Sequence, residues 1–169
     1  MDELFKPQEK RKGINKLFIG GMIAGVVLIG VAIWLLSFKP SVADQTAKIL
    51  EGSFREGSPE FAELTKDIII STGDNTIESP MPTGTISMFI NGKIRNKGTR
   101  TLNALEINVS VVTQFNKVLK EKRILVVPTQ VPLLEPEQII PVTRSLDNFA
   151  KDDDRANIRW KVTAIRVEK

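Results

Sequence analysis

The fold of this chain is set by residues 86–115, which read ISMFINGKIRNKGTRTLNALEINVSVVTQF. Apolar and polar side chains alternate along both halves of this stretch, and the break Asn96-Lys97-Gly98 separates them. Successive side chains of a strand point to opposite faces, so a period of two predicts two strands, each with one buried face. A break of this composition is typical of a turn between strands. The predicted inward side chains are Ile86, Met88, Ile90, Ile94, Leu105, Ile107, Val109, Val111 and Phe115.

The alternation returns near the end of the chain, where Ile158, Trp160, Val162 and Ala164 share one face. The apolar set then shifts to Ile165 and Val167, which predicts a bulge near Ala164. Further strands are predicted at 118–127 and 138–146. Six or seven short strands favour an all-β fold, specifically an immunoglobulin-like antiparallel β-sandwich over residues 67–169.

Two motifs in this region resemble the bacterial FxLYD-type extracytoplasmic domain. Residues 90–98, INGKIRNKG, precede a long alternating strand, and Leu134-Glu135-Pro136 is similar to the leucine-x-proline turn of that family. The resemblance covers residues 84–146, although Val112-Thr113-Gln114-Phe115-Asn116 stands in place of Phe-x-Leu-Tyr-Asp. It implies a β-sandwich on an anchored or secreted protein, and it brings no catalytic residue with it.

A second decisive stretch lies upstream, where residues 17–36 read LFIGGMIAGVVLIGVAIWLL and contain no charge. A helix of this length spans about 30 Å, the hydrocarbon thickness of a bilayer. The sequence therefore predicts one N-terminal transmembrane helix, with membrane lipid as its surroundings. A cleaved signal peptide is the alternative, because Ser41-Val42-Ala43 imitates a cleavage site. The apolar stretch, however, exceeds the usual 7–15 residues of a signal peptide.

The charges that flank the helix predict its orientation. Residues 1–16 contain five Lys/Arg and three acids, whereas only Lys39 and Lys48 follow the helix within a comparable distance. The positive-inside rule then places the N-terminus in the cytoplasm and the β domain in the periplasm or outside the cell. Lys16, Trp34 and Phe38 are the expected interface anchors. The predicted organisation is a cytoplasmic basic tail (1–16), a transmembrane helix (17–38), a linker with short helices (39–66), and the β domain (67–169).

Two short helices are expected inside the linker. Residues 44–51 contain both polar and apolar side chains, and one short helix is expected there. Ser58-Pro59-Glu60 has the composition of a helix start, with a cap candidate, a proline at the first position and an acid in the first turn.

One face of the apolar helix is a candidate site for packing against other helices. Gly21 and Gly25 are four residues apart, and Leu28 and Ala32 continue the same face. Small residues at this spacing let two helix backbones approach closely in lipid. The face predicts contacts with other membrane-protein subunits or a homodimer through the helix. The alternative is that glycine is simply common in membrane helices.

The composition argues against most catalytic chemistry. The sequence has no cysteine, histidine or tyrosine, so the usual thiolates, imidazole bases and zinc ligands are missing. No catalytic, cofactor-binding or metal-binding residues are assigned, and the expectation is a protein that is not an enzyme. The run Asp152-Asp153-Asp154 could offer oxygens to Ca²⁺, but it lacks calcium-loop spacing, which favours a solvated turn.

Charge and aromatic content limit the choice of partners. The net charge of +4 is divided between the tail and the remainder, which is too weak a basic balance for nucleic-acid binding. A local basic stretch is formed by Lys117, Lys120, Lys122 and Arg123. It predicts either a docking patch or a strand edge protected by charge. Phe54, Phe89 and Phe149 are the aromatic candidates for a binding surface outside the core.

Two function classes follow from these observations. The first is a non-catalytic single-pass accessory subunit of a bacterial membrane complex, such as a photosynthetic or respiratory one, in the inner membrane. Its helix would pack in the membrane while its sandwich docks on the extracytoplasmic face. The second is an independent membrane-tethered binding or sensing module.

Overall fold

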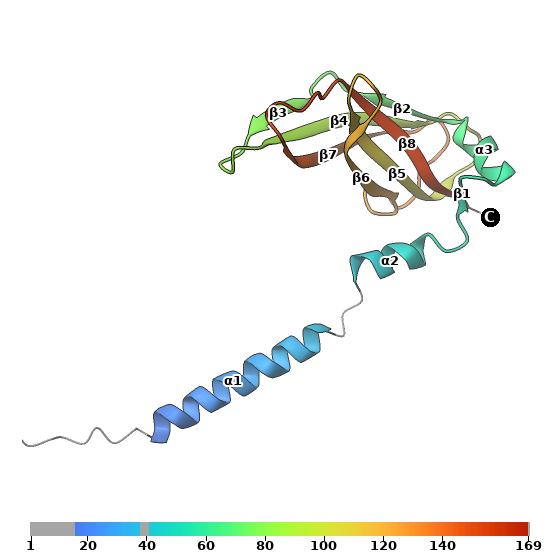
Figure 1. The fold of residues 1–169 in the computed structure, drawn as a ribbon. Helices are drawn as coiled ribbons and strands as arrows, with labels where there is room; N and C mark the ends of the chain where they lie inside the picture. The colour runs from blue at the N-terminus through green and yellow to red at the C-terminus, as the bar shows by residue number, and fades with distance from the viewer. Residues whose placement is uncertain (1–15, 38–40, 169) are drawn as a thin grey trace, which may run out of the picture. The chain divides into compact units, whose positions relative to one another are not determined.

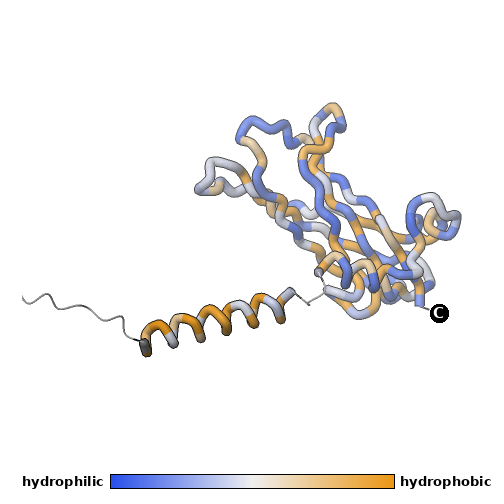
Figure 2. The backbone as a smooth tube through the Cα atoms, turned by 60° about the horizontal axis from the view of Figure 1, so that its bottom comes forward, coloured by the Kyte–Doolittle hydropathy of each residue, from blue (hydrophilic) through white to orange (hydrophobic). Residues whose placement is uncertain are grey.

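The computed structural model describes residues 16–37 and 41–168, which divide into two units, one ending at Val42 and the other beginning at Ala43. The first unit contains α1 (Lys16–Ser37), a helix of 22 residues and therefore about 33 Å long. Figure 2 shows this helix without a hydrophilic stretch. The prediction of one N-terminal apolar helix is confirmed, and α1 is long and apolar enough to cross a membrane.

Three short elements follow: α2 (Val42–Ile49), whose first residue is the last of the first unit, and then β1 (Phe54–Arg55) and α3 (Pro59–Thr65). The start of α3 follows the sequence, because the Ser58 Oγ accepts the Phe61 N–H at 3.2 Å. Leu50, Phe61 and Leu64 are all buried. The segment predicted as a linker with short helices thus contributes side chains to the buried clusters of the β-rich unit.

Four strands form the first sheet, here sheet A, in the order β1-β8-β5-β6. Their bounds are β5 (Leu102–Val112), β6 (Val118–Val127) and β8 (Asn157–Val167), with β1 at one end. All neighbours are antiparallel, and β5 is central between β8 and β6. In Figure 1, β1 is a short piece beside the end of β8.

The other four strands form sheet B around β4 (Ile86–Asn96). Along one side of β4 lie β2 (Ile68–Thr72) and then β3 (Ile77–Pro80), and along the other side lies β7 (Ile139–Phe149). These pairs are also antiparallel. The all-β prediction is therefore confirmed as two antiparallel sheets.

One hydrophobic core draws on both sheets, as the alternation predicts. Ile90 and Ile94 of β4, together with Ile107 and Val109 of β5, are 0% exposed and belong to the same cluster. Burying apolar surface between the two sheets is the main favourable contribution to folding. The charged neighbours Lys93 and Arg95 of β4 are exposed on the opposite face.

The outer face of β5 is also covered, although the alternation predicts only one buried face for this strand. Glu106 and Ser110 are only 6% and 8% exposed, because β5 has strands on both sides that cover it. The Glu106 carboxylate accepts a hydrogen bond from the Thr163 hydroxyl at 2.5 Å, which satisfies this buried charge in part. Ser110 lies between β6 and β8 in the ladder.

The predicted bulge is confirmed, and it lies at Thr163. Glu106 pairs with Ala164 and Ile107 pairs with Val162, so Thr163 is an extra residue in β8. Trp160 and Val162 face the main core before the bulge, and Ile165 does so after it. Ala164 instead faces the outside of sheet A, where it joins a small cluster with Leu50, Ala104 and Leu125.

Two aromatic predictions are wrong. Phe115, expected to face inward, is 81% exposed because β5 ends at Val112 and the chain enters a turn in which Asn116 has a φ of 64°. Phe149, expected outside the core, is 0% exposed, since Asn148 with a φ of 63° turns the next side chain inward. Phe89 is 45% exposed as predicted, and Phe54 is half-buried against the core.

A buried asparagine joins two of the connections. Asn96 is 1% exposed, and its side-chain amide donates to the backbone carbonyls of Arg100 at 2.9 Å and Leu134 at 3.1 Å. Its side-chain oxygen accepts the Gly98 N–H at 3.1 Å. The Asn-x-Gly motif and the Leu134 turn, noted separately in the sequence, are therefore held together by one side chain.

Candidate functional site

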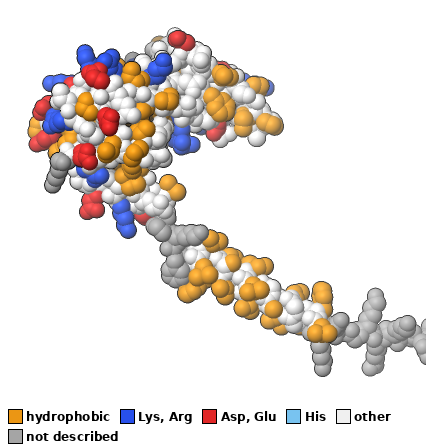
Figure 3. Space-filling view, turned by 180° about the vertical axis from the view of Figure 1, so that it is seen from behind, with side chains coloured by type: hydrophobic (Ala, Val, Ile, Leu, Met, Phe, Trp, Pro, Cys, Tyr) orange, Lys and Arg blue, Asp and Glu red, His pale blue; other side chains and the backbone are white. Residues whose placement is uncertain are grey.

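The surface of α1 is the first candidate site. Its described side chains are exposed from Leu17 to Ser37 apart from Gly25, which is half-buried, and Figure 3 shows hydrophobic side chains along it. Gly21, Gly25, Leu28 and Ala32 share one face by their spacing. A Cβ added at Gly21 or Gly25 would meet no atom within 4 Å, so this face is open to close approach.

The predicted interface anchors are only partly described. Trp34 lies in the last turn of α1 and is 61% exposed. Lys16 is the first residue of α1, but its side chain lies outside the described residues, as does Phe38.

The acidic run is engaged in holding a turn. The Asp153 carboxylate accepts the Ala150 N–H at 2.7 Å, and the Asp154 carboxylate accepts the Gln114 N–H at 2.9 Å. Arg155 binds Glu78 through two hydrogen bonds of 3.1 and 3.2 Å. Across residues 16–37 and 41–168, no group of three or more acidic, Cys or His side chains is arranged to hold a metal ion. The contacts favour the solvated-turn interpretation of this run.

A hydroxyl–carboxylate cluster lies on sheet B. Ser145 donates to Asp147 at 2.6 Å, and Ser87 donates to the same carboxylate oxygen. These two hydrogen bonds, with smaller contributions from the positive charges of Lys122 and Arg144, hold the pKa of Asp147 below its usual 3.8. A carboxylate that accepts two hydroxyl hydrogens is kept ionised, which makes it a poor proton donor and favours a structural role.

The basic stretch lies along an edge of sheet A. Lys120, Lys122 and Arg123 belong to β6, the last strand in the sheet order, and all are exposed. None of the ion pairs in the described part of the chain involves them. Charged side chains on an edge strand discourage pairing with another chain, in agreement with the protected-edge interpretation.

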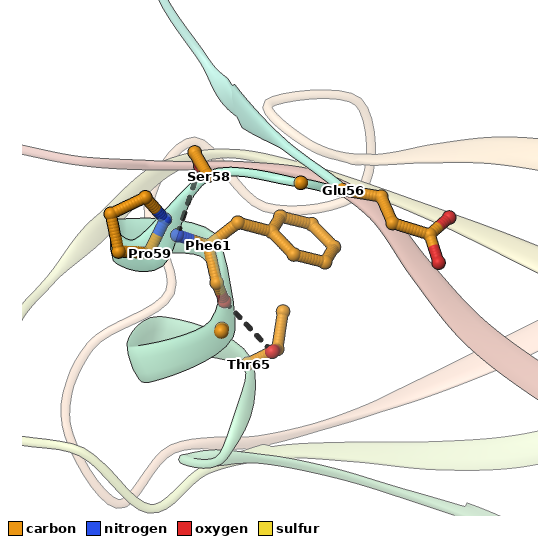
Figure 4. Close-up of a pocket in the computed structure, with 7 residues that line it drawn as sticks. Glu56, Ser58, Pro59, Phe61 and Thr65 are labelled. Atoms are coloured by element: carbon orange, nitrogen blue, oxygen red, sulfur yellow. Dashed lines mark hydrogen bonds between the residues drawn. The ribbon is translucent and has the colours of Figure 1, made fainter.

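The opposite edge of sheet A carries a groove. One part, of about 600 Å³, is lined by residues 56–59, Phe61, Ala62 and Thr65. Figure 4 shows the Phe61 ring between Glu56 and Thr65, and the Thr65 hydroxyl donating to the Phe61 carbonyl, at 2.8 Å. Phe61 is only 8% exposed, so it forms the floor of this part while α3 forms a wall.

A second part of about 360 Å³ continues along β8 and shares Phe61 and Thr65 with the first. Its other lining residues are Ile68, Ile70, Trp160, Lys161 and Val162. We call the two parts together the edge groove. It lies where β8 of sheet A comes next to α3 and to β2 of sheet B.

Trp160 has a different environment from the fully buried one that the alternation predicts. It is half-buried, it packs against the core, and its Nε1 donates to the Thr72 hydroxyl at 3.0 Å. Its ring approaches Gly92 so closely that a Cβ there would lie 2.9 Å from the ring. Period-two patterning identifies the face of a strand but not whether that strand lies at an edge, so the sequence carried no signal for the groove.

No protein-family model matches the chain, and neither does any curated protein sequence. Among solved structures, a Bordetella pertussis protein described as ApaA is 15% identical over 60% of this chain and 90% of its own, with a TM-score of 0.37. An X-ray structure of the structural-genomics target SoR45 is 12% identical over 62% of this chain and 86% of its own, with a TM-score of 0.40. At TM-scores below 0.5, these likenesses carry no weight for fold or function.

Proposed function

We propose that the chain is a single-pass membrane protein and a non-catalytic accessory subunit of a bacterial inner-membrane complex. In this proposal α1 spans the bilayer with the basic tail in the cytoplasm. The β-rich unit is an immunoglobulin-like sandwich, similar to FxLYD-type domains, that docks on a partner in the periplasm or outside the cell. The complex is of an energy-transducing kind, such as a photosynthetic or respiratory one.

The observation that carries the proposal is the exposure of α1. From Leu17 to Leu36 its large apolar side chains are 37% to 85% exposed. Leaving this much apolar surface in water is unfavourable, and lipid or other apolar helices would remove the cost. The open glycine face gives other helices a place for close contact.

Two experiments test the proposal in sequence. Washing membranes with alkaline carbonate should leave the intact chain in the membrane fraction, and its release would contradict the anchor. Extraction in mild detergent, followed by sizing and mass spectrometry, should then recover the chain with a fixed set of other subunits. Recovery of the chain alone would instead favour an independent tethered binding or sensing module, for which the edge groove is the supporting observation.

A further inference from the structure

Most of β8 has one unpaired edge. On one side β8 pairs with β5 along its length, whereas on the other side β1 pairs only with Ala164 and Ile165. For the residues that the structure describes, no backbone hydrogen bond reaches 157–163 from that second side. The unpaired N–H and C=O groups of such an edge form a template for another strand.

The edge is unpaired because the chain leaves it early. After Arg55 the backbone turns at Gly57, whose φ of 101° is a conformation that favours glycine. Ser58 then caps α3, so the chain cannot continue as a partner of β8. The local sequence thus ends β1 after two residues and places α3 as a wall beside the edge.

The groove beneath this edge is apolar on its inner side. Phe61, Ile70 and Trp160 line it, and Trp160 is half-buried rather than covered. A strand that pairs with β8 would point every second side chain into this groove. Apolar side chains at those positions would cover Trp160 and remove its remaining surface from water.

The outer side of the edge is basic. Arg159 and Lys161 face away from the core, and the Lys161 ammonium lies 2.7 Å from the Glu56 carboxylate. Side chains directly opposite each other on paired strands interact, so the alternate side chains of an added strand would lie beside these cations. Acidic residues fit there, as Glu56 already does.

We propose that the β8 edge binds an extended segment of a partner protein as an added strand, with apolar residues facing the groove and acidic residues facing Arg159 and Lys161. This inference rests on the proposed function, because it takes the β-rich unit to be the part that docks on a partner. A second copy of this chain fits less well, because antiparallel pairing of two β8 edges would bring Arg159 and Lys161 close to the same cations of the copy.

The probe is an acetylated eight-residue peptide that alternates glutamate and valine. Titration uses the full chain in detergent micelles with Trp34→Phe, which leaves Trp160 as the single tryptophan. Binding should shift the Trp160 emission to shorter wavelength and slow amide exchange at residues 157–163. Exchange along the basic β6 edge, residues 118–123, should stay unchanged and serves as the internal control.

Matched peptides and variants separate strand pairing from simple charge attraction. A lysine–valine peptide should bind at least about tenfold more weakly than the glutamate–valine peptide. N-methylation of alternate amides of the glutamate–valine peptide should abolish its binding. Thr65→Phe, which fills the groove, should also abolish binding, whereas Glu60→Phe on the exposed side of α3 should bind as the parent chain does. The double variant Arg159→Glu, Lys161→Glu should reverse the preference toward the lysine–valine peptide.

Several results would overturn the proposal. These are no binding at about 1 mM peptide, equal binding of the N-methylated peptide, or slowed exchange confined to β6. Concentration-dependent dimerisation that Thr65→Phe abolishes would assign the edge to a second copy, which also overturns it. Carbonate extraction and co-purification do not involve the peptide. A chain that stays anchored and co-purifies with partners, but binds no peptide, would therefore contradict this inference and leave the proposed function intact.

Discussion

At the scale of single residues, Asn96 is buried and its side chain makes three hydrogen bonds to the backbone. Replacing Asn96 with alanine leaves two backbone carbonyls and one N–H without their side-chain partner. Because unsatisfied buried groups are costly, we expect a loss of about 2–4 kcal/mol in the free energy of unfolding. Thermal and urea unfolding of the full chain in detergent measures it. Asn157→Ala, at an exposed strand end, is the control and should change stability by less than about 0.5 kcal/mol.

A second single residue, Asp147, makes the stability of the folded chain depend on pH. Its pKa in the folded chain lies below the ordinary 3.8, mainly through the hydrogen bonds from Ser145 and Ser87. A lowered carboxyl pKa stabilises the folded chain fully above the unfolded value, and this contribution is lost as the pH falls through the folded pKa. The difference in stability between wild type and Asp147→Asn should therefore be present at about pH 6 and shrink toward about pH 2.

The cause of this pKa shift can be measured directly. Carboxyl NMR titration should place the pKa of Asp147 below 3.8, and Ser145→Ala should raise it toward that value more than Ser87→Ala does. An unchanged titration in both serine variants would contradict the assigned cause.

At the scale of elements, α1 offers a matched pair of glycines. Gly25 lies on the proposed packing face, and Gly30 lies on the opposite side of the helix by the 3.6-residue period. If close backbone approach holds α1 against other helices, Gly25→Ile should weaken association by about tenfold and Gly30→Ile should have little effect. The yield of co-purified subunits, or sedimentation of the purified chain in micelles, measures the difference. Equal effects of the two substitutions would contradict the claim that the face with Gly25 packs against other helices.

At the scale of the whole molecule, the absence of cysteine in the sequence permits a clean test of topology. Lys151→Cys places a thiol on the exposed connection before β8, and Glu9→Cys places one in the basic tail. In spheroplasts, a membrane-impermeant maleimide should label Cys at position 151 at once and at position 9 only after permeabilisation. The reverse pattern would show that the β-rich unit lies in the cytoplasm.

The sequence predicted the parts of this fold that depend on local periodicity. Strands β4, β5 and β8 and helix α1 have patterns long enough to decide their type, and even the bulge in β8 is visible as a change of phase. The errors occur where the backbone departs from regular geometry, as at Phe115 and Phe149 beside residues of positive φ. The edge groove could not be predicted, because it depends on the non-consecutive strand order β1-β8-β5-β6.

The extra residue at Thr163 accounts for the change of phase in the last strand. Deleting Thr163 would leave Val162 and Ala164 as direct neighbours opposite Ile107 and Glu106, so the strand would lose its bulge while Ile165 still faced the core and Ala164 the outside. If Thr163 instead paired as a regular strand residue, every side chain beyond it would exchange faces, with Ala164 inward and Ile165 outward. Among sequences that share this fold, those without the bulge should therefore have one residue fewer between Trp160 and Ile165.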